Sequence, residues 1–183
     1  MKYAIFYRLK GQAQKTHQRL IKTIGPKFGE NFVVEHPIPP HITLKYTFQT
    51  TQIKKTEKAI KDFLKTQKPQ KFRITGFGYF NRPKYDVIYL KVVFSKQIQK
   101  IRLGLVERVK SEKGIKDLHP RKFDKDPRPH ITIVNRIHKK NFNKIWNYLK
   151  TQKKPHFNLN FDAIALMKKP KDYWLLYKEF KIK

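Results

Sequence analysis

The chain has 183 residues and no cysteine, and its 43 Lys and Arg against 13 Asp and Glu give a formal charge of +30. The length is typical of one domain with its own core. The lack of cysteine excludes disulfide frameworks and thiolate metal sites. The charge favours a polyanion partner such as nucleic acid, although lysines on ordinary solvated helix faces would give the same total.

No apolar stretch approaches the ~20 residues that a membrane span needs. The first residues, Met1 to Leu9, alternate like a strand and are unlike a signal peptide. We therefore expect a cytoplasmic protein without a membrane partner, and we expect it to be a monomer.

Apolar periodicity predicts the secondary structure in chain order. The predicted elements are a strand over 3–9, a helix over 12–24 ended by Gly25 and Pro26, a short strand over 31–35, a strand over 41–48, a helix over 51–66, strands near 71–80 and 86–94, a helix over 96–111, a strand over 130–137, a helix over 140–152, and strands near 156–167 and 172–181. Residues 114–128 lack periodicity and are predicted to be a long loop, which inside a compact domain is usually functional or disordered. This mixture predicts an α+β fold with antiparallel sheets and outer helices.

The tetrapeptide Pro-His-Ile-Thr occurs twice, at 40–43 and at 129–132. Each copy leads from a proline-bearing segment into an apolar, β-prone run. Side chains of a strand alternate between its two faces, so His41 and Thr43 point the same way, as do His130 and Thr132. Each copy therefore presents an imidazole and a hydroxyl on one face.

The sequence around the two tetrapeptides repeats in the same order. Both are followed by a basic helical segment that ends in Leu-Lys-Thr-Gln-Lys, at 64–68 and 149–153. Then come a strand-like run, a basic segment with a proline, and an aromatic-rich strand, at 87–94 in one copy and 173–180 in the other. We interpret this as an internal duplication within one two-lobed domain over 1–183.

Paired histidines suit in-line displacement at phosphorus. One imidazole can activate the attacking oxygen as a base while the other protonates the leaving oxygen as an acid. The hydroxyls of Thr43 and Thr132 can hold the non-bridging oxygens, where charge develops. Neither a metal nor another cofactor is required, because the leaving group is protonated.

The two His-x-Thr motifs, each followed by an apolar residue within a duplicated unit, resemble the 2H phosphoesterase superfamily. Within it the chain is similar to the LigT-like branch of RNA 2′,3′-cyclic phosphodiesterases, also called 2′-5′ RNA ligases. The resemblance implies a bilobal fold with pseudo-twofold symmetry, two antiparallel sheets, and a central cleft that holds both motifs. It also implies metal-free hydrolysis of a cyclic phosphate, with His41, Thr43, His130 and Thr132 as the catalytic residues.

Five further residues are candidates for substrate binding. Lys45 shares the face of Thr43 if the strand stays regular, Arg136 shares that of Thr132, and Arg128 precedes the second motif. The alternative for the two strand residues is that they end in solvent. Tyr79 and Phe80 follow Gly76 and Gly78 on a strand expected to border the cleft, where a ring can stack on a base, although core packing explains most aromatic residues.

The other five histidines are predicted to be surface or structural, because they lack the His-x-Thr context. These are His17, His36, His119, His138 and His156. The leading hypothesis is hydrolysis of 2′,3′-cyclic phosphate at RNA ends, with 2′-5′ ligation as the reverse reaction. The alternatives are a cyclic phosphodiesterase that acts on a small nucleotide and a non-catalytic RNA-binding module of the same fold.

Overall fold

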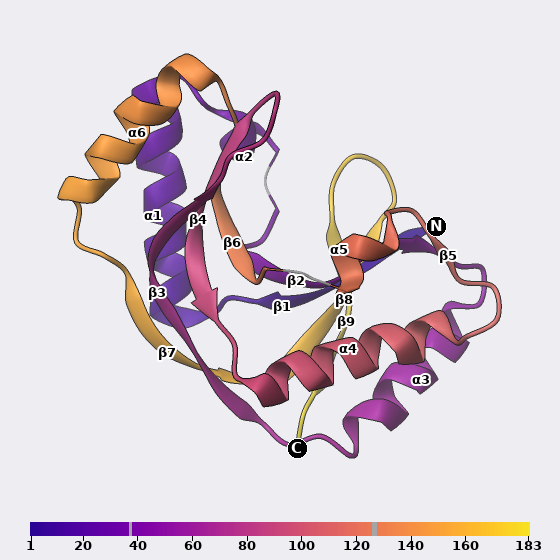
Figure 1. Cartoon of the computed structure of the whole chain (residues 1–183). Helices are drawn as coiled ribbons and strands as arrows, with labels where there is room; N and C mark the ends of the chain where they lie inside the picture. Colours follow the sequence, from indigo (N-terminus) through magenta and orange to yellow (C-terminus); the bar gives the residue numbers. More distant parts are fainter. Residues whose placement is uncertain (37, 126–127) are drawn as a thin grey trace.

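The computed structural model of the chain describes residues 1–36, 38–125 and 128–183. In these residues the strands form a five-stranded and a four-stranded antiparallel sheet, here called sheet A and sheet B (Figure 1). Sheet A has the order β5 (Lys116–Asp117), β2 (His41–Gln49), β1 (Lys2–Arg8), β8 (Ala163–Lys169), β9 (Leu175–Lys181). Sheet B has the order β6 (His130–Ile137), β4 (Asp86–Val93), β3 (Gln70–Phe80), β7 (His156–Phe161).

The longer helices pack in two pairs outside the sheets. Helix α1 (Gly11–Phe28) lies beside α6 (Lys139–Thr151), and α3 (Ile53–Leu64) lies beside α4 (Lys96–Lys110) (Figure 1). Helix α1 also contacts β6, and α4 contacts β2. Each motif strand therefore packs against a helix from a different pair. Two short helices, α2 (Phe32–Glu35) and α5 (Arg121–Lys125), precede the two motif strands. The predicted α+β class with two antiparallel sheets and outer helices is confirmed.

The sheets show how the duplicated halves correspond. Motif strand β2 pairs with β1, and motif strand β6 pairs with β4. Apart from the edge strands β5, β7 and β9 and the short helices α2 and α5, each half runs strand, helix, motif strand, helix, strand. Its last strand, β3 or β8, crosses into the other sheet, where β3 joins β4 and β8 joins β1. The expected match of 87–94 with 173–180 is wrong, because β4 neighbours a motif strand whereas β9 lies at the far edge of sheet A.

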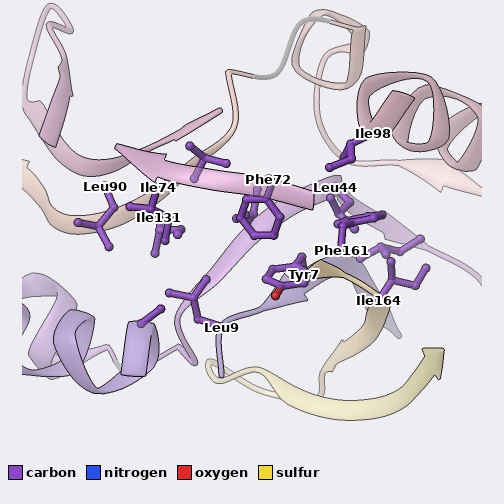
Figure 2. Packing of buried hydrophobic residues seen from close by; sticks show 14 of the residues in the cluster. Tyr7, Leu9, Leu44, Phe72, Ile74, Leu90, Ile98, Ile131, Phe161 and Ile164 are labelled. Carbon is purple, nitrogen blue, oxygen red and sulfur yellow. The ribbon is translucent and has the colours of Figure 1, made fainter. Parts of the chain in front are cut away.

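One continuous apolar core joins the two sheets (Figure 2). At its centre the ring of Tyr7 from β1 contacts Phe72 of β3 edge-on and stacks on Phe161 of β7. The Tyr7 hydroxyl donates a hydrogen bond of 3.1 Å to the carbonyl of Asn160. Burial raises the pKa of this hydroxyl to about 12, so it stays a donor at every physiological pH. The contact fixes sheet A against sheet B.

Three predicted segments differ from the structure in the type or number of their elements. Residues 32–35 form helix α2, because the Asn31 carbonyl accepts hydrogen bonds from the amides of Val34 and Glu35, so this turn overrides the β preference of the valines. The predicted strand over 156–167 is two strands, β7 and β8, which belong to different sheets. The loop over 114–128 contains β5 and α5.

Helix α1 does not end at Gly25 and Pro26 but continues to Phe28. Gly25 is buried where a Cβ would meet the Glu30 carbonyl at 3.1 Å, so its small size serves packing. The helix ends at Gly29, whose φ of 69° is left-handed and lets the next amide, of Glu30, bond the Gly25 carbonyl. In the described chain no helix has the length and apolar character that crossing a membrane requires.

Replacing Gly29 with Ala should lower the free energy of unfolding by about 1–2 kcal/mol, because a Cβ disfavours the left-handed conformation. Urea denaturation measures the change. Gly29→Asn is the matched control and should cost less, since asparagine adopts this conformation more readily. Equal losses in the two variants would contradict the explanation, because a Cβ on Gly29 meets nothing within 4 Å and the two variants then differ only in backbone strain.

Candidate active site

The two motif strands lie next to each other, and β2 and β6 contact directly. His41 and Thr43 are half-buried, and Ile42 between them is buried; His130, Ile131 and Thr132 follow the same pattern. The alternation confirms that the histidine and threonine of each motif share one face.

A β-bulge follows each motif at the same place. In the first, Thr43 is opposite Phe6 but Lys45 is opposite Ile5, so one extra residue, Leu44, is inserted in β2. In the second, Thr132 is opposite Tyr89 and Val134 is opposite Ile88. Two consecutive buried residues mark both insertions. Such a bulge re-aims the side chains beyond it, so Lys45 and Val134 turn away from the face that the histidine and threonine share.

Both catalytic candidates are oriented by the same hydrogen bond. His41 Nδ1 lies 2.8 Å from the carbonyl of Pro39, and His130 Nδ1 lies 2.6 Å from the carbonyl of Arg128. A carbonyl only accepts, so Nδ1 carries the hydrogen in each ring. The lone pair of each neutral imidazole is therefore at Nε2, which is the atom left to exchange protons with a ligand.

The surroundings keep both rings neutral. Burial lowers the pKa of His41 to about 4, and the bond to Pro39 opposes that shift in part, while positive charge on His130 and His17 lowers the pKa further. Burial also lowers the pKa of His130, with the cations Arg82 and Arg128 adding to the effect.

Aromatic rings hold the two imidazoles in place. The Phe6 ring stacks on His41 with 3.9 Å between centroids. Phe80 meets His130 edge-on at 4.9 Å, and Tyr89 lies 5.3 Å from the same ring. Tyr89 fits only because Gly78 lacks a side chain, since a Cβ there would come within 2.6 Å of the tyrosine ring. Gly78 therefore keeps Tyr89 beside the second motif.

A pocket opens beside each histidine. The His130 pocket has a volume of about 340 Å³ and is lined by Tyr46, Tyr79, Phe80, Asn81, Arg82, Phe123, Arg128 and His130. The His41 pocket has a volume of about 210 Å³ and is lined by residues of α1, α2, β2 and β6 that include His17, Phe32, His41, Thr132 and Asn135. The motifs thus lie between an aromatic, cationic pocket and a smaller one.

The His130 pocket brings together three of the predicted binding residues. Arg128 lies over the Phe80 ring at 4.7 Å, and Tyr79 packs on Phe142 and Trp146 of α6. Phe80 is nearly buried and forms the wall beside His130, whereas Tyr79 is 46% exposed. The sequence pattern did not single out Arg82, whose guanidinium lies 5.7 Å from the centre of the Phe80 ring.

Two predicted binding residues lie elsewhere. The prediction that Lys45 shares the face of Thr43 is wrong, because the bulge at Leu44 turns Lys45 into the interior, where it is fully buried. Arg136 is exposed beyond the second bulge with a left-handed φ of 59°, and its guanidinium lies 4.1 Å over the ring of Phe32. Phe32 lines the His41 pocket, but Arg136 itself lines neither of the two pockets.

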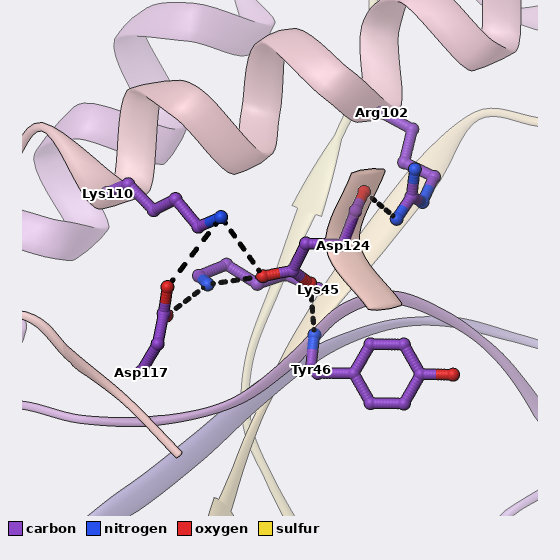
Figure 3. Close-up of polar contacts among 6 residues, drawn as sticks. All are labelled: Lys45, Tyr46, Arg102, Lys110, Asp117 and Asp124. Carbon is purple, nitrogen blue, oxygen red and sulfur yellow. Dashed lines mark hydrogen bonds and ion pairs between the residues drawn. The ribbon is translucent and has the colours of Figure 1, made fainter. Parts of the chain in front are cut away.

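Lys45 is the centre of a buried ionic cluster (Figure 3). Its ammonium lies 2.6 Å from Asp117 and 3.2 Å from Asp124, and Lys110 of α4 lies 3.7 Å and 3.4 Å from the same two carboxylates. Asp124 also accepts a hydrogen bond from the Tyr46 amide, and its carbonyl accepts one from Arg102. The cluster fastens β5 and α5 to β2.

This fastening builds one wall of the His130 pocket. Phe123 lies next to Asp124 on α5, and its ring lies 5.4 Å from that of Tyr46. Both rings line the pocket. Within the segment predicted to be a long loop, 114–128, residues 116–125 form what we call the strap, which closes the pocket from the side of sheet A.

His17 supports the second motif from α1. Its Nε2 donates to the carbonyl of Thr132 at 2.7 Å, and the ring is buried, which lowers its pKa. The sequence predicts a surface or structural role for this residue, and nothing in its neighbours marks it as close to the site. In the described part of the chain, no cluster of three His, Cys, Asp or Glu side chains could hold a metal ion.

The model of the 2′-5′ RNA ligase superfamily matches residues 12–172. The chain belongs to this superfamily. "Putative phosphoesterase GK0864" of Geobacillus kaustophilus is 29% identical over 78% of each chain, and "Putative phosphoesterase" of Bacillus pumilus is 24% identical over 91% of each. The resemblance to LigT-like phosphoesterases is thereby confirmed.

Solved structures support the same fold for this superfamily member. TT0787 of Thermus thermophilus aligns over 100% of this chain and 98% of its own, with 18% identity and a TM-score of 0.59. Escherichia coli LigT complexed with 3′-AMP aligns over 99% and 97%, with 13% identity and a TM-score of 0.55. The bilobal architecture is therefore that of LigT.

Replacing Lys45 with Val, its counterpart in the second motif strand, should destabilise the protein by about 3 kcal/mol, because it leaves Asp117 and Asp124 short of a buried partner. Lys110→Met is the control and should cost less, since its side chain is 13% exposed and lies farther from both carboxylates. Urea unfolding tests the order. If Lys45→Val left the free energy of unfolding unchanged, the cluster would not be what holds the strap.

Proposed function

We propose that the protein hydrolyses 2′,3′-cyclic phosphate at RNA ends with His41 and His130 as its acid–base pair. The observation that carries the proposal is the matched orientation of the two imidazoles: each donates Nδ1–H to a carbonyl two residues earlier and keeps Nε2 for the substrate. Membership of a phosphoesterase superfamily supports the same chemistry.

In the proposed reaction, a water attacks phosphorus in line with the leaving ribose oxygen. One imidazole takes a proton from the water as the new P–O bond forms, and the other, as imidazolium, protonates the oxygen whose bond to phosphorus breaks. Proton transfer at each end contributes roughly 10²–10⁴-fold. The hydroxyls of Thr43 and Thr132 hold the non-bridging oxygens, whose charge Arg82 and Arg128 offset.

The nucleoside next to the phosphate would occupy the His130 pocket. Tyr79 and Phe123 line it as partly exposed rings, which can stack on any base and contribute ~1–3 kcal/mol each where they do. LigT of similar fold has been solved with 3′-AMP and with phosphate, which supports a nucleotide ligand for this architecture. One nucleoside fits a volume of about 340 Å³, so a cyclic mononucleotide is a second candidate substrate.

His41→Ala and His130→Ala should each lower kcat for a 2′,3′-cyclic phosphate by about 10²–10⁴-fold, in the presence or absence of a chelator. Chromatographic analysis of the products measures the rate and identifies the phosphate isomer. His156→Ala, an exposed histidine at the start of β7, is the control and should stay active. Full activity in either catalytic variant would rule out the two-histidine mechanism, and loss of the wild-type activity in chelator would rule out a metal-free one.

The pH profile of kcat/KM should be bell-shaped with its maximum below pH 6.5. The base must be neutral and the acid protonated in the free enzyme, and both histidine pKa values lie below the ordinary value, that of His41 at about 4. Activity therefore falls as pH rises through the higher of the two lowered values. In Arg128→Ala the limb of the profile that reports the pKa of His130 should move to higher pH, because a cation that lowers this pKa is gone. A maximum above pH 7 would contradict this assignment.

A further inference from the structure

One face of sheet B continues from the second motif across all four of its strands. Residues directly opposite in a sheet share a face, as do alternate residues along a strand. His130 is opposite Lys91, and Val93 is two residues further along β4. Val93 is opposite Arg73 on β3, which is opposite Asn158 on β7.

A second row lies beyond the first, where Lys71 is opposite Asn160. We call Lys71, Arg73, Val93, Asn158 and Asn160 the open face. All five side chains are exposed, while the alternating residues Phe72, Ile74 and Val92 face the core. The open face is therefore the solvent side of the same sheet that carries His130 and Thr132.

The open face is hollowed and cationic. A depression of about 670 Å³ is lined by all five of its residues and by no acidic side chain. Within the described ranges, neither Lys71 nor Arg73 forms an ion pair. Lys and Arg side chains not neutralised by the protein are available to phosphate, and asparagine amides can both donate to and accept from base edges.

The separation from the catalytic histidine suits a short length of strand. Neighbouring strands are about 4.8 Å apart, and alternate residues along a strand are about 7 Å apart. Arg73 is two strands and one such step from His130, and Lys71 is one step further, so the cations lie roughly 12–20 Å from the imidazole. A separation of this size is spanned by a few nucleotides of single strand beyond the reacting end.

We propose that the open face binds the RNA strand upstream of its cyclic phosphate end. The inference rests on the proposed function, which places that end between His41 and His130. Single-stranded RNA is the polyanion that fits, because its 3′ end alone carries the cyclic phosphate and its backbone leads away from the His130 pocket. Lys71 and Arg73 contact phosphates, and Asn158 and Asn160 contact sugars or base edges.

The test compares Lys71→Ala/Arg73→Ala with the wild type on two substrates, a cyclic mononucleotide and a decanucleotide that ends in a 2′,3′-cyclic phosphate. The KM for the decanucleotide should rise about tenfold at low salt, with kcat and the mononucleotide kinetics unchanged. The plot of log(kcat/KM) against log[salt] for the decanucleotide should become less steep by about 1.4, since each single-strand phosphate contact contributes about 0.7 to the steepness.

The matched control is Lys55→Ala/Lys144→Ala, which removes the same charge from exposed positions on α3 and α6. It should leave the decanucleotide KM within about twofold of the wild type. An equal rise in the control, or equal effects on both substrates, would overturn the open face as a binding surface while the proposed function stands. A wild type that hydrolyses neither substrate would overturn the proposed function and this inference with it.

Discussion

The extra residue in each motif strand is the constraint on which the site depends. Without it, strand alternation would place Lys45 and Val134 on the face of the two histidine–threonine pairs. The insertions at Leu44 and Ile133 turn both positions into the interior. Each motif strand therefore presents an imidazole and a hydroxyl on the site face. The residues that follow the threonine point into the interior.

The two halves use the interior position differently, and this difference makes the site asymmetric. Val134 packs in the core, whereas Lys45 must be neutralised by Asp117 and Asp124, which come from the strap. A chain with 13 acidic residues thus commits two of them to one buried lysine. The result is a pocket with an aromatic wall on the His130 side, while the His41 side has a smaller pocket of different composition.

Local pattern was enough to predict the two motif strands, the helices that follow them, and the pairing of His41 with Thr43 and of His130 with Thr132. It failed where tertiary contacts decide. Nothing in the apolar pattern distinguishes a bulge from a regular strand, so Lys45 was placed on the wrong face. Gly25 was predicted to end the helix, because its close contact with Glu30 cannot be seen in the sequence. The break between β7 and β8 at Asp162, where the chain passes from one sheet to the other, was missed because it interrupts no apolar run.

The identical hydrogen bonds at His41 and His130 have a consequence for the direction of the proposed reaction. Both rings are held in the same tautomer with the same nitrogen free, so neither is fixed by its hydrogen bond as donor or acceptor of the proton. Microscopic reversibility exchanges the two roles when the reaction runs backwards. In the proposed reaction such a site imposes no preferred sense on the chemistry, and the relative supply of water and of a competing ribose hydroxyl would decide between cleavage and joining.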